Sequence, residues 1–131
     1  MAEHPHAALV RKGYEAFSRG DMDTLRGLMT NDATYHVPGS SQLSGDLKGQ
    51  DAIIDYWGRL FSLTDGTLKS ELQHLLVDGR GHVVSVHRAT ATRQGRSLDM
   101  IGGIVFRIVG DKATDFDECA TDIDAFDEFF A

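Results

Sequence analysis

Apolar side chains recur along this chain at two spacings, and the change of spacing divides it into a helical first half and a stranded second half. In residues 82–117, apolar and polar positions alternate with a period of two, and turns containing glycine at 94–96 and 110–111 interrupt the alternation. This period, with many β-branched residues, is typical of strands that have one buried face. The stretch therefore predicts three consecutive strands, the last of them over 113–119.

The first half of the chain carries a spacing of three or four residues. Val10, Tyr14 and Phe17, for example, form one apolar stripe on a helix. The same reasoning predicts three helices, over 5–18, 22–29 and 51–63. Two further strands are predicted over 33–37 and 68–78. The polar run SSQLSGDLKG is interpreted as a flexible loop at the rim of a pocket.

These elements predict an α+β fold in which a cone-shaped, curved antiparallel sheet wraps around the N-terminal helices. Such a cone encloses an apolar pocket, which is the usual place for a small molecule. The pair Gly102-Gly103 interrupts a strand and indicates a bulge or the close approach of a helix or ligand. Residues 122–130 predict a short helix or strap with phenylalanines that dock. With 131 residues, the chain is expected to be a single domain over 1–131.

Charge and composition narrow the classes of partner. The net charge is −7, and residues 111–128 hold eight carboxylates and one lysine, so neither nucleic acid nor an anionic membrane is an expected partner. The single cysteine excludes an intrachain disulfide. The chain shows no signal-peptide pattern and no apolar run of about 18 residues. We expect a soluble cytoplasmic protein.

Several stretches carry a resemblance to a known family. The segments GDMDTLRGLMTNDATYHVPG, GQDAIIDYW and GRSLDMIGGIVFRIVGDKATDF resemble the SnoaL-like branch of the nuclear-transport-factor-2-like superfamily, relatives of polyketide cyclases and ketosteroid isomerase. The resemblance implies a homodimer formed through the convex face of the sheet. It also implies an acid/base carboxylate on the last strand. The groups of a standard ketosteroid isomerase are missing, because Val37, Gly13 and Ile104 stand near their places.

The candidate catalytic residues are two histidines and a last-strand carboxylate. His36 precedes the predicted rim, and His87 lies on the strand face of Val83 and Ala89. A histidine exchanges protons near neutral pH without much tuning. On the last strand, Asp117 is the candidate if the Ala113 face is concave, with Asp115 on the same face. Glu118 is the candidate if Phe116 faces inward, and a bulge would exchange the two assignments.

The expected function is an acid/base reaction without a cofactor. The pocket is predicted to hold a hydrophobic cyclic or polyketide-like molecule against side chains that stack or pack on it: Tyr14, Tyr35, Tyr56, Trp57, Phe61 and Met100. The hypothesis is a cyclase, isomerase or dehydratase in which His36 and the last-strand carboxylate transfer a proton. A non-catalytic small-molecule binding domain of the same fold is the alternative. No spacing of His, Cys or carboxylates predicts a metal site.

Overall fold

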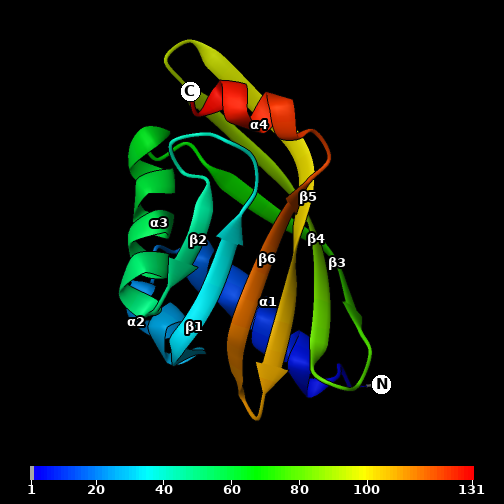
Figure 1. Ribbon diagram of the computed structural model, residues 1–131. Helices are drawn as coiled ribbons and strands as arrows, with labels where there is room; N and C mark the ends of the chain where they lie inside the picture. The colour runs from blue at the N-terminus through cyan, green and yellow to red at the C-terminus, as the bar shows by residue number, and fades with distance from the viewer. Residues whose placement is uncertain (1) are drawn as a thin grey trace.

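The computed structural model describes residues 2–131, which form four helices and a six-stranded sheet (Figure 1). The helices are α1 (Pro5–Ser18), α2 (Met22–Gly27), α3 (Gln50–Leu63) and α4 (Ile123–Phe129). The strands are β1 (Met29–Val37), β2 (Gly45–Lys48), β3 (Lys69–Val77), β4 (His82–Arg93), β5 (Arg96–Val109) and β6 (Lys112–Ala120). No helix within residues 2–131 is long and apolar enough to cross a membrane.

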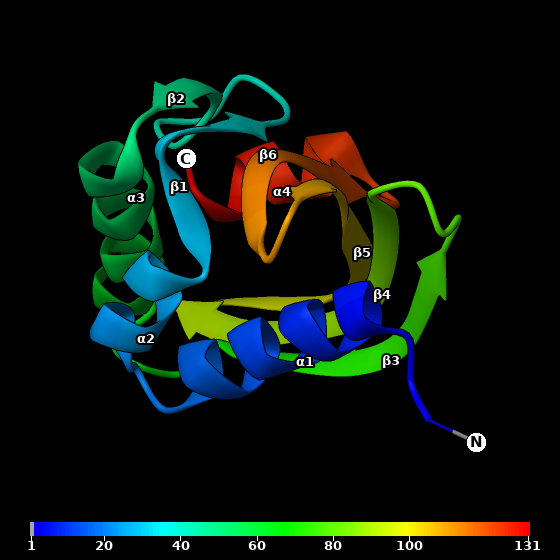
Figure 2. The same cartoon turned by 90° about the horizontal axis from the view of Figure 1, so that it is seen from below.

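The strands are ordered β2-β1-β6-β5-β4-β3 across one sheet. Figure 2 shows that the sheet curves towards the side on which α1 and α3 lie. The predicted α+β fold, with a curved sheet around the N-terminal helices, is confirmed. One strand pair departs from the antiparallel expectation, because β1 runs parallel to β6. This pair brings Tyr35 of β1 opposite Phe116 of β6.

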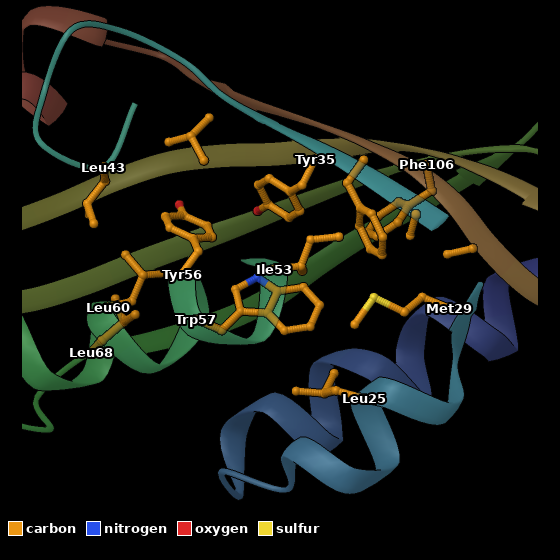
Figure 3. Close-up of a cluster of buried hydrophobic side chains, with 14 of the residues drawn as sticks. Leu25, Met29, Tyr35, Leu43, Ile53, Tyr56, Trp57, Leu60, Leu68 and Phe106 are labelled. Atoms are coloured by element: carbon orange, nitrogen blue, oxygen red, sulfur yellow. The ribbon is translucent and has the colours of Figure 1, made fainter. Parts of the chain in front are cut away.

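The core lies between α3 and the concave face of the sheet (Figure 3). The buried stripe of α3 includes Ile53, Tyr56 and Trp57. The Tyr35 ring stacks on Phe116 with centroids 5.3 Å apart, and Trp57 meets Phe116 edge-on at 5.9 Å. Aromatic pairs at these distances add to the stabilisation from burial alone. The rings thus fix α3 against β1 and β6.

The predicted loop after β1 contains a strand that sequence reasoning missed. Strand β2 pairs antiparallel with the end of β1. Its sequence GDLK has only one apolar residue, Leu47, so no alternation of apolar residues marks it. The helix predicted over 22–29 is also too long, since α2 ends at Gly27 and β1 begins at Met29.

The glycine pair in β5 lies where the backbones of the neighbouring strands approach closely, and not at a bulge or against a helix. A Cβ on Gly103 would lie 2.0 Å from the carbonyl oxygen of Ser85, and a Cβ on Gly102 would lie 2.8 Å from that of Cys119. The register between β4 and β5 runs through both glycines without a shift. Gly102 and Gly103 therefore let the neighbouring strands pass close to β5 where the sheet curves.

The C-terminal helix is fastened to the loop that follows β1. Asp127 of α4 accepts hydrogen bonds from the backbone N–H of Ser40 at 2.9 and 3.0 Å and from its hydroxyl at 3.1 Å. Gly39 has a φ of +85°, and a Cβ on it would lie 2.2 Å from Oδ1 of Asp127. The predicted docking of this helix is confirmed, because Phe126, Phe129 and Phe130 are buried.

Candidate active site

A cavity of about 130 Å³ lies between the helices and the concave face of the sheet. Its walls include most of the aromatic and apolar residues predicted for a pocket: Tyr14, Tyr35, Tyr56, Trp57 and Met100. Phe61 is not among the lining residues. Its ring packs on Phe17, with centroids 4.8 Å apart. The position expected for Phe61 is therefore wrong.

Glu118 of β6 is the carboxylate that reaches this cavity. The register between β5 and β6 shifts where Arg107 faces Asp115 and Ile108 faces Ala113, which leaves Thr114 as an extra residue on β6. Such a bulge reverses which residues face inward. Ala113 before the bulge and Phe116 and Glu118 after it therefore all face the cavity.

Two tyrosines hold the Glu118 carboxyl group. Tyr35, from β1, donates a hydrogen bond to Oε1. The hydroxyl of Tyr56, from α3, lies 2.9 Å from Oε1 and 3.1 Å from Oε2. Figure 3 shows the two rings side by side between α3 and the sheet. Their burial follows from the core packing, so the carboxyl group is positioned by the same residues that join α3 to the sheet.

The proton affinity of this group is set by its surroundings. Glu118 is half-buried as a residue because it lines the cavity, whereas its carboxyl group lies deep among the rings. Burial raises the pKa of the Glu118 carboxyl, and the hydrogen bonds from Tyr35 and Tyr56 act in the opposite direction. Burial and the charge of Glu118 raise the pKa of both tyrosines well above the ordinary value. At neutral pH the tyrosines therefore keep their protons and donate hydrogen bonds to the Glu118 carboxyl group.

A second polar cluster joins α1 to β4. The hydroxyl of Tyr14 lies 2.7 Å from Oγ of Ser85 and 2.6 Å from Nδ1 of His87. Tyr14 has one proton, so it donates to one of these atoms and accepts from the other. Burial lowers the pKa of His87 to about 4, and burial raises the pKa of Tyr14. Both side chains are therefore neutral at pH 7.

His87 lies opposite Gly102, which has no side chain to cover it. The two residues pair across β4 and β5, and both line the cavity. A Cβ on Gly102 would lie 3.3 Å from Nε2 of His87. Nε2 of His87, which Tyr14 does not contact, thus lies over Gly102 with no side chain between them. Ser85 was missed by sequence reasoning, although a polar residue between the inward-facing Val83 and His87 is a usable signal.

His36 and Asp117 lie outside the cavity, which corrects the positions expected for them. Adjacent residues of a strand point to opposite faces, so the inward Tyr35 and Phe116 direct His36 and Asp117 outward. The two outward residues face each other across β1 and β6. Nδ1 of His36 lies 2.6 Å from a carboxylate oxygen of Asp46, which is also exposed.

The arrangement as a whole can transfer protons on a molecule held in the cavity. It combines a desolvated carboxyl group of raised pKa with a separate pair of neutral hydrogen-bonding groups, Tyr14 and His87. A desolvated carboxyl group that faces a cavity can act as a general acid or base on a bound molecule. Within residues 2–131, no group of three or more His, Cys, Asp or Glu side chains is placed to hold a metal ion.

Comparison with known proteins identifies the family. The model of the SnoaL-like domain matches residues 10–116. The uncharacterized protein Rv0034 of Mycobacterium tuberculosis (strain ATCC 25618 / H37Rv) is 31% identical over 131 residues, which is the full length of both chains. The structure of Bal32a from a soil-derived mobile gene cassette has a TM-score of 0.95 and 42% identity, with 97% of each chain covered.

A more distant structure shares the fold. A putative polyketide cyclase from Xanthomonas campestris pv. campestris has a TM-score of 0.75 and 16% identity, with 97% of each chain covered. At that identity, the likeness concerns the arrangement of helices and strands. Together with the match over residues 10–116, it agrees with the order of elements described above. The chain belongs to the SnoaL-like domain family.

Proposed function

We propose that the protein is a cofactor-independent acid/base enzyme that moves a proton on a hydrophobic cyclic small molecule. The observation that supports this proposal best is the Glu118 carboxyl group. It lines an apolar cavity, is held by Tyr35 and Tyr56, and has no basic partner among the hydrogen bonds and ion pairs of residues 2–131. A structural carboxylate at such a site would normally be paired with a cation. Family membership and the polyketide-cyclase neighbour agree with cyclase or isomerase chemistry.

The roles follow from the two clusters. Glu118 takes a proton from a carbon or oxygen of the ligand and returns it elsewhere on the same molecule, so the carboxyl group ends in its starting state. Tyr35 and Tyr56 hold the carboxyl group and stabilise its charged form. Tyr14 donates its proton to Nδ1 of the neutral His87 ring, which leaves the proton of that ring on Nε2. His87 then donates a hydrogen bond from Nε2 to the ligand oxygen on which negative charge develops. The apolar walls keep water from competing for the proton.

Proton exchange into a simple ketone tests the proposal. The probe is cyclohex-3-en-1-one in deuterated water, since loss of a proton next to its carbonyl and return to the distal alkene carbon gives the conjugated isomer. We expect the protein to accelerate deuterium incorporation and isomerisation, both followed by NMR. Glu118→Gln keeps the shape of the side chain and should reduce the rate by at least about 100-fold, the low end of what general acid–base catalysis contributes.

The control variant is Asp117→Asn, which changes a carboxylate one residue away that points out of the cavity. It should retain the exchange rate. Equal loss in both variants would contradict a specific role for Glu118. If the probe binds and wild-type protein gives no exchange above buffer, the proposal fails and the cavity belongs to a non-catalytic binding domain.

We also propose that two copies associate through the outer face of the sheet, as the family resemblance implies. Leu76, Val84 and Val105 lie in register across β3, β4 and β5 on that face. Leu76 is 60% exposed and Val84 is 37% exposed. A row of aligned apolar side chains on a face that no helix covers is typical of an interface.

A further inference from the structure

The size of the cavity limits what Glu118 can act on. Its volume is about 130 Å³. An apolar cavity of roughly 150 Å³ binds benzene, whereas pockets for drug-sized ligands span roughly 300–1,000 Å³. A cavity of this volume therefore holds about one six-membered ring with a small substituent.

The charges around the cavity limit the ligand in a second way. None of the described residues that line it is a lysine or an arginine. Two lining groups have an ordinary pKa below 7. Glu118 can carry only a negative charge, and His87 is neutral because burial lowers its pKa. An anionic substituent would find no counter-charge and would face Glu118. Burial of an unpaired ion is strongly unfavourable, so the cavity selects against anions.

The floor of the cavity limits the ligand in a third way, because it separates the two polar clusters. His87 lies on β4 and Glu118 on β6, with β5 between them. Neighbouring strands are about 4.8 Å apart, so the two backbones are separated by roughly 10 Å. In that gap β5 contributes Gly102 opposite His87 and Ile104 opposite Glu118. Gly102 leaves room for a flat ring beside the imidazole, and Ile104 gives the ring an apolar surface.

We propose that the substrate is an uncharged molecule that places a single oxygen-bearing ring in the cavity, with the oxygen on the Tyr14–His87 pair and a ring position facing Glu118. That this molecule is turned over rests on the proposed function, whereas its binding in the cavity does not. A molecule with several fused rings would seat only one of them at a time. Carboxylated and phosphorylated compounds are excluded.

The fluorescence of the single tryptophan reports whether a molecule occupies the cavity. Trp57 is the only tryptophan of the chain and lines the cavity, so a bound ring changes its fluorescence. The probes are benzamide and benzoate, which match in size and differ in charge at pH 7.5, together with 2-naphthamide and anthracene-2-carboxamide. We expect benzamide to bind at least tenfold more tightly than benzoate. Adding a second and a third ring should lower the affinity.

Matched variants show which side chain makes the cavity bind neutral molecules in preference to anions. In Glu118→Gln the preference for benzamide over benzoate should fall at least threefold, while Asp117→Asn should keep it. Tyr14→Phe should weaken benzamide binding, because the ring keeps its packing and loses the hydroxyl. The inference is overturned if benzoate binds as tightly as benzamide, if affinity rises with each added ring, or if benzamide does not bind.

The outcomes separate this inference from the proposed function. Selective binding of the neutral one-ring probe without proton exchange into cyclohex-3-en-1-one supports the ligand class and contradicts the enzymatic proposal. If cyclohex-3-en-1-one does not bind and exchange occurs only with multi-ring or anionic ketones, the enzymatic proposal is supported and the ligand class is contradicted.

Discussion

The hydroxyl of Tyr56 on α3 lies 2.9 Å from Oε1 of Glu118 on β6, so a helix and a strand far apart in sequence meet at one carboxyl group. Tyr35 of β1 donates to the same oxygen. Because both rings belong to the hydrophobic core, the carboxyl group cannot move without disturbing the packing of α3 on the sheet. This relationship connects the stability of the fold to the chemistry of the cavity.

Removing one of the two donors should change the proton affinity of Glu118 in a known direction. The hydrogen bond from Tyr56 lowers the pKa of Glu118, so Tyr56→Phe should raise that pKa further. The acidic limb of the pH–rate profile for the exchange reaction should then move to higher pH. A move to lower pH, or a loss of rate with no change in the profile, would contradict this account of the Tyr56 hydroxyl. Tyr56→Phe should also lower the free energy of unfolding by about 1–2 kcal/mol, measured with urea.

The low proton affinity of His87 predicts a loss of stability in acid. The unfolded chain binds a proton at the ordinary histidine pKa of about 6.5, and the folded chain does so only at a pKa of about 4. Between these values the unfolded state holds more protons, so stability falls as the pH falls. The full effect is about 3 kcal/mol between pH 7 and pH 4, at about 1.4 kcal/mol for each pKa unit.

Glu118 acts in the opposite direction, because its raised pKa makes the folded state bind a proton first and gain stability as the pH falls. The two effects are separated by comparing wild-type protein with His87→Gln in urea at pH 7 and pH 4.5. His87→Gln should lose less stability between these two pH values than wild-type protein. Identical losses would show that His87 is not held in its neutral form.

The contact between α4 and the loop after β1 predicts an unusually sensitive glycine. Gly39→Ala should be destabilised for two reasons: the positive φ and the contact of the new Cβ with Asp127. Gly66→Ala is the matched control, since Gly66 has a φ of +73° and nothing within 4 Å of its Cβ position. We expect a loss of about 1 kcal/mol for Gly66→Ala and at least about 2 kcal/mol for Gly39→Ala, in thermal unfolding. Equal losses would mean that Asp127 moves aside without cost.

The proposed association through the outer face is tested by one charge. Leu76→Glu places a carboxylate in the row with Val84 and Val105, and burying it unpaired between two copies is unfavourable. The variant should be a monomer by light scattering at concentrations where wild-type protein is a dimer. Ile123→Glu is the control, because Ile123 is 38% exposed on α4 and away from this row. A dimer that survives Leu76→Glu would place the interface elsewhere.

The layers of the fold follow from the sequence because each element carries a clear spacing. The helix over residues 5–18 was predicted with the bounds that α1 has. Strand β2 escaped prediction because it is short, polar and at the edge of the sheet, where only pairing with β1 defines it. The parallel pairing of β1 with β6 was missed for a related reason, since it depends on how distant segments meet and not on any local pattern.

The sequence indicated which kinds of residue line the pocket. It did not show which of two adjacent residues in a strand faces inward. Tyr35 and His36 are adjacent in one strand, so the pocket cannot receive both, and the buried ring of Tyr35 decides which one it receives. On β6 the extra residue Thr114 exchanges the inward face between Asp117 and Glu118. One inserted residue in a strand leaves no mark in hydrophobic periodicity, so the choice between these carboxylates required the structure.

The carboxyl group of Glu118 is desolvated, and burial raises its pKa above the ordinary value of a glutamate. The most direct measurement is a pH titration of side-chain carboxyl carbons by NMR on glutamate-labelled protein, with the Glu118 signal assigned from its absence in Glu118→Gln. We expect the pKa of Glu118 to lie above 4.5 and to rise further in Tyr56→Phe. A Glu118 signal that titrates at or below 4.5 would contradict it, because the carboxyl group would then be an ordinary charged side chain.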